Sequence, residues 1–209
     1  MDLLITIFGF IILILSVIIH EIAHGSVAYS LGDATAKMEG RLTLNPINHI
    51  DPIGTIVLPF FLLILGSPFV VGWAKPVPVN FNNIIDKRWG ALKVSLAGPA
   101  ANFVIAIIFA LIIRFVPMLG SELYTIFSIV VVYNLVLAIF NLIPIPPLDG
   151  SHILFDLLPQ GETLESIKEF LTRYGFIILV FFIFIFPQIN WIFSISEKIF
   201  FFLSGQPFV

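Results

Sequence analysis

The stretch that decides the fold is His20-Glu21-Ile22-Ala23-His24, which follows the apolar run LLITIFGFIILILSVII at residues 3–19. Two histidines four residues apart lie on one face of a helix. There both imidazoles can bind one metal ion, and the intervening glutamate can act as a base. The run before them has no charged residue and is typical of a membrane span. Ionisable side chains cost about 2.5–3.5 kcal/mol each inside a span, so the pattern favours a metal site over unpaired histidines.

The composition of the whole chain is that of a polytopic membrane protein. Of its 209 residues, 59% are hydrophobic and 11% are charged, whereas a soluble domain has ~25% charged residues. The mean hydropathy is +1.09. There is no cysteine, which excludes disulfides, iron–sulfur clusters and thiolate metal sites. Any metal must therefore be held by His, Asp, Glu or Asn.

The apolar runs divide the chain into a catalytic transmembrane core, residues 1–160, and a region of C-terminal hydrophobic helices, residues 161–209. Three spans are predicted at about residues 3–31, 91–116 and 122–143, the first of them a retained span because no basic segment precedes it. A further apolar segment, residues 52–73, has the length of one crossing but is broken by prolines, which predicts a re-entrant or broken segment. We expect an all-α polytopic membrane protein with about four to six transmembrane helices.

Two short stretches outside the spans are predicted to be extended. The stretch from Arg41 to Pro46 is typical of a short strand closed by a turn. Residues 73–79 carry proline at alternate positions, Pro76 and Pro78, which suits an edge segment and not a central strand.

A third metal ligand must come from outside the first span. The soluble pattern H-E-x-x-H-x-x-G-x-x-H, which adds a nearby histidine, is absent, because Val27 and Ser30 stand where it has glycine and histidine. Asp149 is favoured because it follows an apolar span and a proline break that can turn its carboxylate back into the bundle. The adjacent Gly150 permits close backbone approach. The residues considered as third ligand are Glu39, His49, Asp51, Asp149, His152 and Asp156.

A shared site for His20, His24 and Asp149 places the C-terminal ends of two spans at one membrane face. Basic residues in the connecting segments and at the start of the second span fall on that same side, whereas the turn at residues 118–122 has none. The positive-inside rule then predicts that the site faces the cytoplasm. The basic residues in question are Lys37, Arg41, Lys75, Lys87, Arg88 and Lys93.

Three motifs in this order resemble the intramembrane site-2 protease family, a family of zinc metalloproteases. They are HEIAHG at residues 20–25, AGPAANF at residues 97–103 and NLIPIPPLDG at residues 141–150. The stretches GRLTLNPINHIDPIGT, residues 40–55, and GWAKPVPVN, residues 72–80, further resemble its small bacterial members without appended domains. The resemblance covers roughly residues 19–159.

The resemblance implies a role for each matching residue. His20, His24 and Asp149 would hold one zinc ion per chain, with water in the fourth position and Glu21 as the general base. Asn141 would stabilise the oxyanion or hold substrate. The two extended stretches would form a small membrane-associated β-hairpin that receives substrate through Trp73, Ala74, Lys75 and Val77. Residues expected to support the site structurally are Gly98, Pro99, Asn102 and Gly150.

The expected function is zinc-dependent cleavage of a transmembrane substrate by a multi-pass protein of the cell membrane. Its expected partners are the transmembrane substrate and the lipid bilayer. A regulatory partner or a homo-oligomer is compatible with the sequence, and no nucleic acid is expected to bind. A metal-ion transporter with the same ligands is one alternative, disfavoured because no internal repeat is present. A non-cleaving binder of membrane helices is another, disfavoured because Glu21 is intact.

Overall fold

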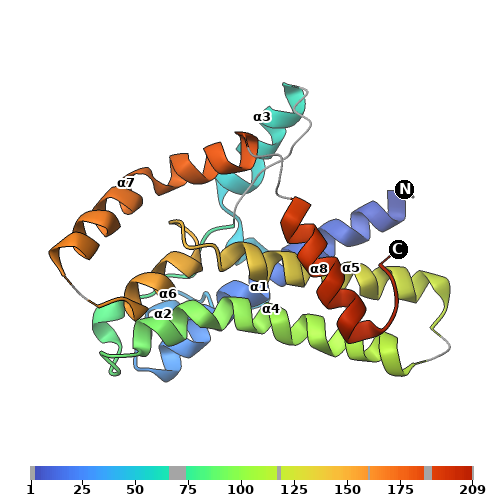
Figure 1. The fold of residues 1–209 in the computed structure, drawn as a ribbon, viewed down its shortest axis with the longest axis horizontal. Coiled ribbons are helices and arrows are strands. Elements are labelled where there is room, and N and C mark those ends of the chain that lie inside the picture. Colours follow the sequence, from blue (N-terminus) through green and yellow to red (C-terminus); the bar gives the residue numbers. More distant parts are fainter. Residues whose placement is uncertain (1–2, 66–73, 117–118, 160, 186–189, 209) are drawn as a thin grey trace.

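The structure is a computed structural model that describes residues 3–65, 74–116, 119–159, 161–185 and 190–208. Every regular element among them is helical (Figure 1). In chain order the elements are α1 (Leu3–Ser30), α2 (Thr35–Met38), the 3-10 helix η1 (Pro46–His49), the π-helix η2 (Pro52–Val57), α3 (Leu58–Ile64), the 3-10 helix η3 (Phe81–Asn83), α4 (Gly90–Phe115), α5 (Ser121–Asn141), α6 (Asp149–Leu157), α7 (Glu162–Ile185) and α8 (Asn190–Ser204).

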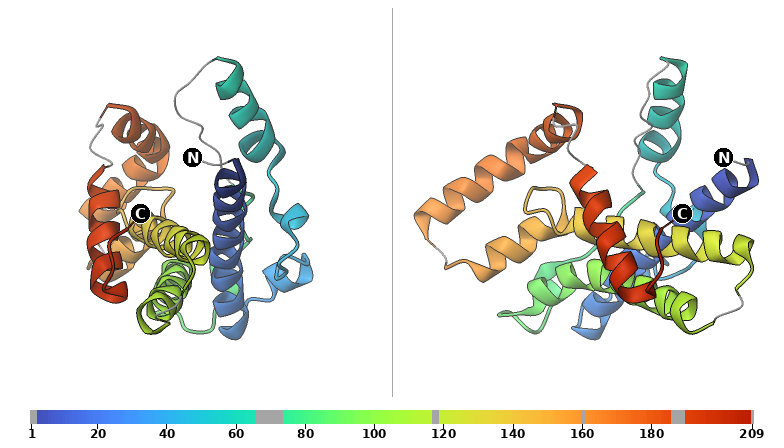
Figure 2. Two further views of the ribbon diagram at one scale, coloured as in Figure 1. Left: turned by 90° about the vertical axis from the view of Figure 1, so that its right-hand side faces the viewer. Right: turned by 45° about the vertical axis from the view of Figure 1, so that its right-hand side comes forward.

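Three helices among the described residues are long and apolar enough to cross a membrane, namely α1, α4 and α5. They lie at the three long apolar runs of the sequence and pack against one another as the centre of the molecule (Figure 2). These helices form because an uninterrupted apolar run in lipid must satisfy its own backbone hydrogen bonds. The chain is therefore a multi-pass membrane protein with an all-α core.

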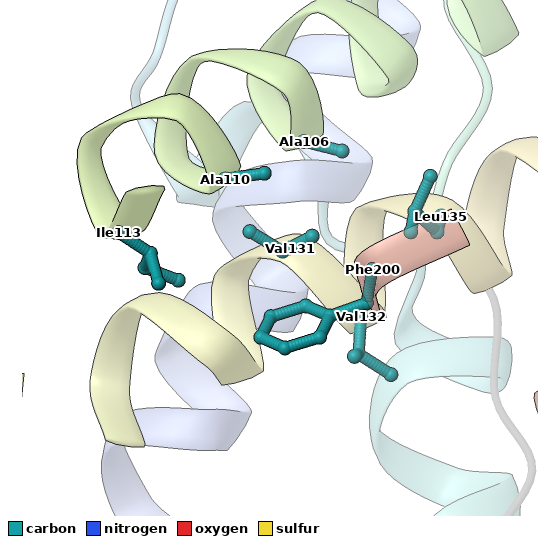
Figure 3. Packing of buried hydrophobic residues seen from close by; sticks show 7 residues of the cluster. All are labelled: Ala106, Ala110, Ile113, Val131, Val132, Leu135 and Phe200. Carbon is teal, nitrogen blue, oxygen red and sulfur yellow. The ribbon is translucent and has the colours of Figure 1, made fainter. Parts of the chain in front are cut away.

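The core between α4, α5 and α8 combines small and large side chains (Figure 3). Two alanines of α4 let the backbone of α5 approach closely, as small residues do between membrane helices. Phe200 of α8 is fully buried against them. The cluster consists of Ala106, Ala110, Ile113, Val131, Val132, Leu135 and Phe200.

The expectation of four to six transmembrane helices is wrong for the described residues, because only three helices meet the length and hydropathy that a crossing needs. α7 fails because its first half is rich in charged residues, among them Glu162, Glu165 and Lys168. α8 fails because it has 15 residues, fewer than the ~20 that span a bilayer.

The predicted β-hairpin is also wrong, because no strand occurs among the described residues. Residues 74–80 have no regular structure. Pairing with another strand is hindered there, because Pro76 and Pro78 have no backbone N–H to donate to a neighbouring strand. The segment is held instead by the side chain of Arg41, whose Nη2 donates to the carbonyl oxygens of Lys75 (2.7 Å) and Pro76 (3.1 Å).

The predicted broken segment at residues 52–73 begins as η2 and continues as α3, which stands away from the central bundle (Figures 1 and 2). Asp51 caps its start, with Oδ1 accepting hydrogen bonds from the N–H groups of Ile53 and Gly54. A bend in this segment is expected at Pro59 or at residues 66–68. Pro59 lies inside α3, whereas residues 66–68 and Trp73 lie outside the described residues.

Candidate metal centre and active-site pocket

His20 and His24 lie on the same face of α1, one helical turn apart, as their spacing dictates. Their rings meet edge to face with centroids 4.7 Å apart, and their Nε2 atoms are 3.1 Å apart. Each Nδ1 has a partner in α4. His20 Nδ1 lies 2.6 Å from Oδ1 of Asn102, and His24 Nδ1 lies 2.7 Å from the carbonyl oxygen of Val94.

Asp149 reaches the two histidines from the first turn of α6. Its Oδ2 lies 3.2 Å from Nε2 of His20 and 3.2 Å from Nε2 of His24. The next residue, Gly150, packs directly on the end of α5, where an added Cβ would lie 2.2 Å from the carbonyl oxygen of Leu142. A side chain at position 150 would therefore push the first turn of α6, and Asp149 with it, away from the histidines.

The three side chains fit a zinc ion. Their ligand atoms form a nearly equilateral triangle of 3.1, 3.2 and 3.2 Å, and ligand bonds of 2.0–2.1 Å at tetrahedral angles separate neighbouring ligand atoms by about 3.3 Å. Both Nδ1 atoms face acceptor oxygens and must carry protons, so both Nε2 atoms present lone pairs to each other and to the carboxylate. A cation at the centre of the triangle relieves this repulsion. Among the described residues, this is the group that could hold a metal ion.

Gly98 of α4 gives the histidine pair its space. A Cβ at this position would lie 2.3 Å from Nε2 of His24 and 2.6 Å from Nε2 of His20. The next residue, Pro99, is buried inside α4 and has no N–H for the carbonyl of Ser95 one turn earlier. Ser95 itself lines the pocket beside the metal-ligand triad.

Glu21 does not join the triad but is held by a different part of the chain. Its Oε2 accepts a hydrogen bond of 2.8 Å from the backbone N–H of Val77. Val77 belongs to residues 74–80, which we call the strap. The carboxylate of the general-base candidate is thus oriented by a backbone group 56 residues away in sequence.

The strap is fastened on both sides of Val77. Before it, Arg41 binds two strap carbonyls, and the Lys75 N–H donates to the carbonyl oxygen of His49. After it, the Asn80 N–H donates to Oδ2 of Asp33, a fully buried carboxylate just beyond α1. Burial raises the pKa of Asp33, but the hydrogen bonds that it accepts outweigh burial and hold this pKa below its usual value.

A pocket of about 320 Å³ opens beside the triad, between α1, the strap, α4, α5 and α6. Pro76, Val77 and Val79 form its strap side, whereas Ala74 and Lys75 are not among its lining residues. Phe81 stacks on the ring of His152 at its rim, with centroids 6.3 Å apart. The lining residues are His20, Glu21, His24, Pro76, Val77, Val79, Phe81, Val94, Ser95, Asn141, Pro147, Asp149 and His152.

Asn141 also lines the pocket, at the last residue of α5. Its Nδ2 donates a 2.9 Å hydrogen bond to the carbonyl oxygen of Leu137 in its own helix. The second N–H of that amide nitrogen leaves Asn141 with a donor for substrate.

The other candidate third ligands are not part of the metal-ligand group. Glu39 directly follows α2. His49 is buried, with Nε2 2.8 Å from the carbonyl oxygen of Thr43, and Asp51 caps η2. His152 contributes a ring to the pocket rim. Burial raises the pKa of Asp156, although His152 and Lys168 act in the opposite direction.

Two features of the site were missed by sequence reasoning. The contact between Val77 and Glu21 uses a backbone group and leaves no signal in the sequence. The second feature is a buried chain of hydrogen bonds that links His20 to Asn102, Asn134 and Ser16. Asn134 could have been singled out, because a polar amide inside an apolar span requires a polar partner.

Comparison with known proteins bears on this site. Over residues 116–182 the chain matches Peptidase family M50. It is 44% identical over 176 residues to a Bacillus subtilis protein named "Putative zinc metalloprotease YwhC", covering 80% of this chain and 76% of that relative. The chain belongs to peptidase family M50, the site-2 proteases.

Two further relatives also have names that describe zinc metalloproteases. One is "Putative zinc metalloprotease Rip2" of Mycolicibacterium smegmatis. It is 30% identical over 184 residues, which cover 87% of this chain and 68% of Rip2. The zinc metalloprotease MJ0392 of Methanocaldococcus jannaschii is 29% identical over 153 residues, 72% of this chain and 34% of that protein. No solved structure matches the chain. The protein is a metalloprotease, and zinc is its cofactor.

Proposed function

We propose that this metalloprotease hydrolyses peptide bonds within transmembrane segments of substrate proteins, close to the cytoplasmic face, with Glu21 as the general base. The observation that carries the proposal is the position of the triad. His20 and His24 lie in the C-terminal half of an apolar helix, and Asp149 follows another apolar helix. In this proposal residues 1–160 form the catalytic core, because every residue that lines the pocket lies within them.

His20, His24 and Asp149 would hold the zinc ion. When bound, zinc supplies Lewis acidity that polarises the scissile carbonyl and lowers the pKa of an attacking water. Glu21 takes the proton of that water as its oxygen attacks the carbonyl carbon, and later delivers the proton to the leaving amine nitrogen. The Val77 N–H, bonded to Oε2, fixes the direction in which the Glu21 carboxylate faces.

The substrate would enter the pocket as an unwound segment, because the carbonyls of a helical substrate are bonded within the helix. It would run along the strap, against Val77 inside the pocket and against Ala74 and Lys75 beyond it. Opposite the strap lies the α5–α6 corner, where Asn141 offers an amide donor to the developing oxyanion. Pro76, Val77, Val79 and Phe81 make this side of the pocket largely apolar, which suits the side chains of a transmembrane segment.

Replacing Glu21 with Gln tests the catalytic part of the proposal. The amide oxygen of Gln can still accept from the Val77 N–H, but the side chain cannot take a proton. We expect Glu21→Gln to abolish cleavage of a reporter with a transmembrane substrate segment while one zinc per chain is retained. Glu162→Gln, the same chemical change in the first turn of α7 and outside the pocket, should cleave at the unchanged rate. Wild-type cleavage by Glu21→Gln would rule out the mechanism.

The proposed orientation can be tested because the chain has no cysteine. A single cysteine at position 88, before α4, should be labelled by a membrane-impermeant thiol reagent from the cytoplasmic side. A cysteine at position 121, the first residue of α5, should be labelled from the opposite side. The reverse pattern would place the site at the outer face.

A further inference from the structure

Three polar side chains lie in the interior of the three-helix bundle, away from the pocket. Ser16 belongs to α1, Asn102 to α4 and Asn134 to α5, and the two asparagines are fully buried. None of the three lines the pocket beside the triad. Burying an amide in a membrane bundle is costly unless its hydrogen bonds are satisfied. The presence of three polar side chains at one buried place therefore indicates a specific role.

Hydrogen bonds to backbone carbonyls determine how both amides are oriented. One side-chain atom of Asn134 lies 2.8 Å from the carbonyl oxygen of Val130, which only accepts, so this atom is the nitrogen. The Asn134 oxygen therefore faces Asn102 and accepts a 2.8 Å hydrogen bond from its Nδ2. The same Nδ2 is 3.3 Å from the carbonyl oxygen of Ser16, which is also an acceptor. Asn134 Nδ2 additionally donates to Oγ of Ser16, at 2.9 Å.

The orientation of Asn102 determines which nitrogen of His20 carries a proton. With its nitrogen engaged by Asn134 and Ser16, Asn102 presents Oδ1 to His20 Nδ1 at 2.6 Å. An oxygen at this distance requires Nδ1 to be the donor. Neutral His20 then has its lone pair on Nε2, which is the atom directed at Asp149 Oδ2.

The two histidines differ in how this arrangement is maintained. His24 Nδ1 donates to the backbone carbonyl of Val94, which every residue type at position 94 would provide. His20 depends on the side chain of Asn102, and an amide can rotate to present either oxygen or nitrogen. Two acceptors keep the Asn102 nitrogen turned away from His20, namely the Asn134 oxygen at 2.8 Å and the Ser16 carbonyl oxygen at 3.3 Å. Asn134 supplies the shorter of the two hydrogen bonds.

We propose that Asn134 is a positioning residue for the metal centre. Through Asn102 it holds His20 in the tautomer whose Nε2 binds zinc. This inference rests on the proposed role of His20 as a metal ligand. Partners in the outer shell of a metal ligand orient it and set its basicity, and losing one lowers metal affinity by about 10- to 100-fold.

The test measures zinc affinity by competition with a chromogenic chelator in detergent-solubilised protein, without any cleavage assay. Asn134→Leu keeps the number and branching of the side-chain heavy atoms but cannot accept from Asn102, and we expect zinc binding about tenfold weaker. Asn102→Asp presents an acceptor oxygen to His20 whichever way its carboxylate rotates. The second carboxylate oxygen would face the Asn134 oxygen, which cannot donate to it, so in this background Asn134→Leu should not weaken zinc binding.

This comparison separates positioning from general destabilisation. Equal weakening by Asn134→Leu in both backgrounds would mean that Asn134 only supports the bundle, and an unchanged affinity in the wild-type background would also overturn the proposal. Asn134→Ala repeats the cycle if the leucine variant aggregates. Ser128→Ala is the matched control, because Ser128 is a buried residue of α5 whose hydroxyl has no hydrogen-bond partner among the described residues. Wild-type affinity in His20→Ala would instead refute the proposed metal site itself.

Discussion

Replacing Gly98 with alanine should empty the metal centre without removing any ligand. The added methyl carbon would lie 2.3 Å from Nε2 of His24, whereas ordinary contacts begin at 3.4 Å. Either the ring or α4 must therefore move by about 1.1 Å. Metal–ligand distances tolerate only about ±0.2 Å, so the displaced imidazole cannot complete the site. We expect purified Gly98→Ala to hold well under one zinc per chain.

Zinc content by atomic emission spectrometry and the thermal midpoint with and without added zinc are the measurements. The sign of the stability change is informative, because Gly98 has ordinary helical φ. Alanine there would by propensity alone stabilise a helix by about 1 kcal/mol, whereas overpacking costs about 1–3 kcal/mol. Gly120→Ala is the control, since its Cβ meets nothing within 4 Å. A Gly98→Ala protein with full zinc and a raised midpoint would refute the steric argument.

Two further predictions concern the strap. Asp33 accepts hydrogen bonds from Thr35, Asn80 and Asn83. Because its folded pKa lies below its unfolded value, its stabilisation is complete above about pH 4 and disappears as pH falls through the folded pKa. Asp33→Asn should lower stability by about 1.5–3 kcal/mol at pH 7, measured by thermal denaturation, with the difference from wild type vanishing in acid. Arg41→Gln should release the strap carbonyls and misplace Glu21. Cleavage should then fall by about tenfold to a hundredfold with zinc content unchanged, and Arg41→Lys should restore part of the rate.

Different outcomes would contradict these two predictions. A stability difference between wild type and Asp33→Asn that persists unchanged at low pH would show that the carboxylate charge is not what holds the strap. Loss of zinc in Arg41→Gln would show that the strap supports the triad and not only Glu21.

The sequence alone determined the three long helices and two of the three metal-ligand candidates. Apolar runs at α1, α4 and α5 form helices wherever lipid surrounds them, because no other local structure satisfies the backbone there. The four-residue spacing of His20 and His24 places both on one helix face whatever surrounds them. Asp149 could be favoured among six candidates because a proline break and Gly150 follow an apolar run.

Strand prediction failed for a physical reason. The alternate prolines that suggested an edge segment also removed the donors of a ladder, and the guanidinium of Arg41 took the carbonyls of Lys75 and Pro76 instead. The number of spans was overestimated because Phe-rich apolar stretches in α7 and α8 resemble spans locally. Charge in the first half of α7 and the short length of α8 exclude both.

Only the tertiary structure decided what surrounds the histidines. The space at Gly98, the Val77 N–H on Glu21 and the amides behind His20 come from segments 56 to 118 residues away from the α1 residues that they meet when the helices pack. Such contacts depend on helix rotation and depth, which local patterns do not encode. The run from His20 to His24 specifies a place for a metal, whereas packing specifies which nitrogen faces it and where the base points.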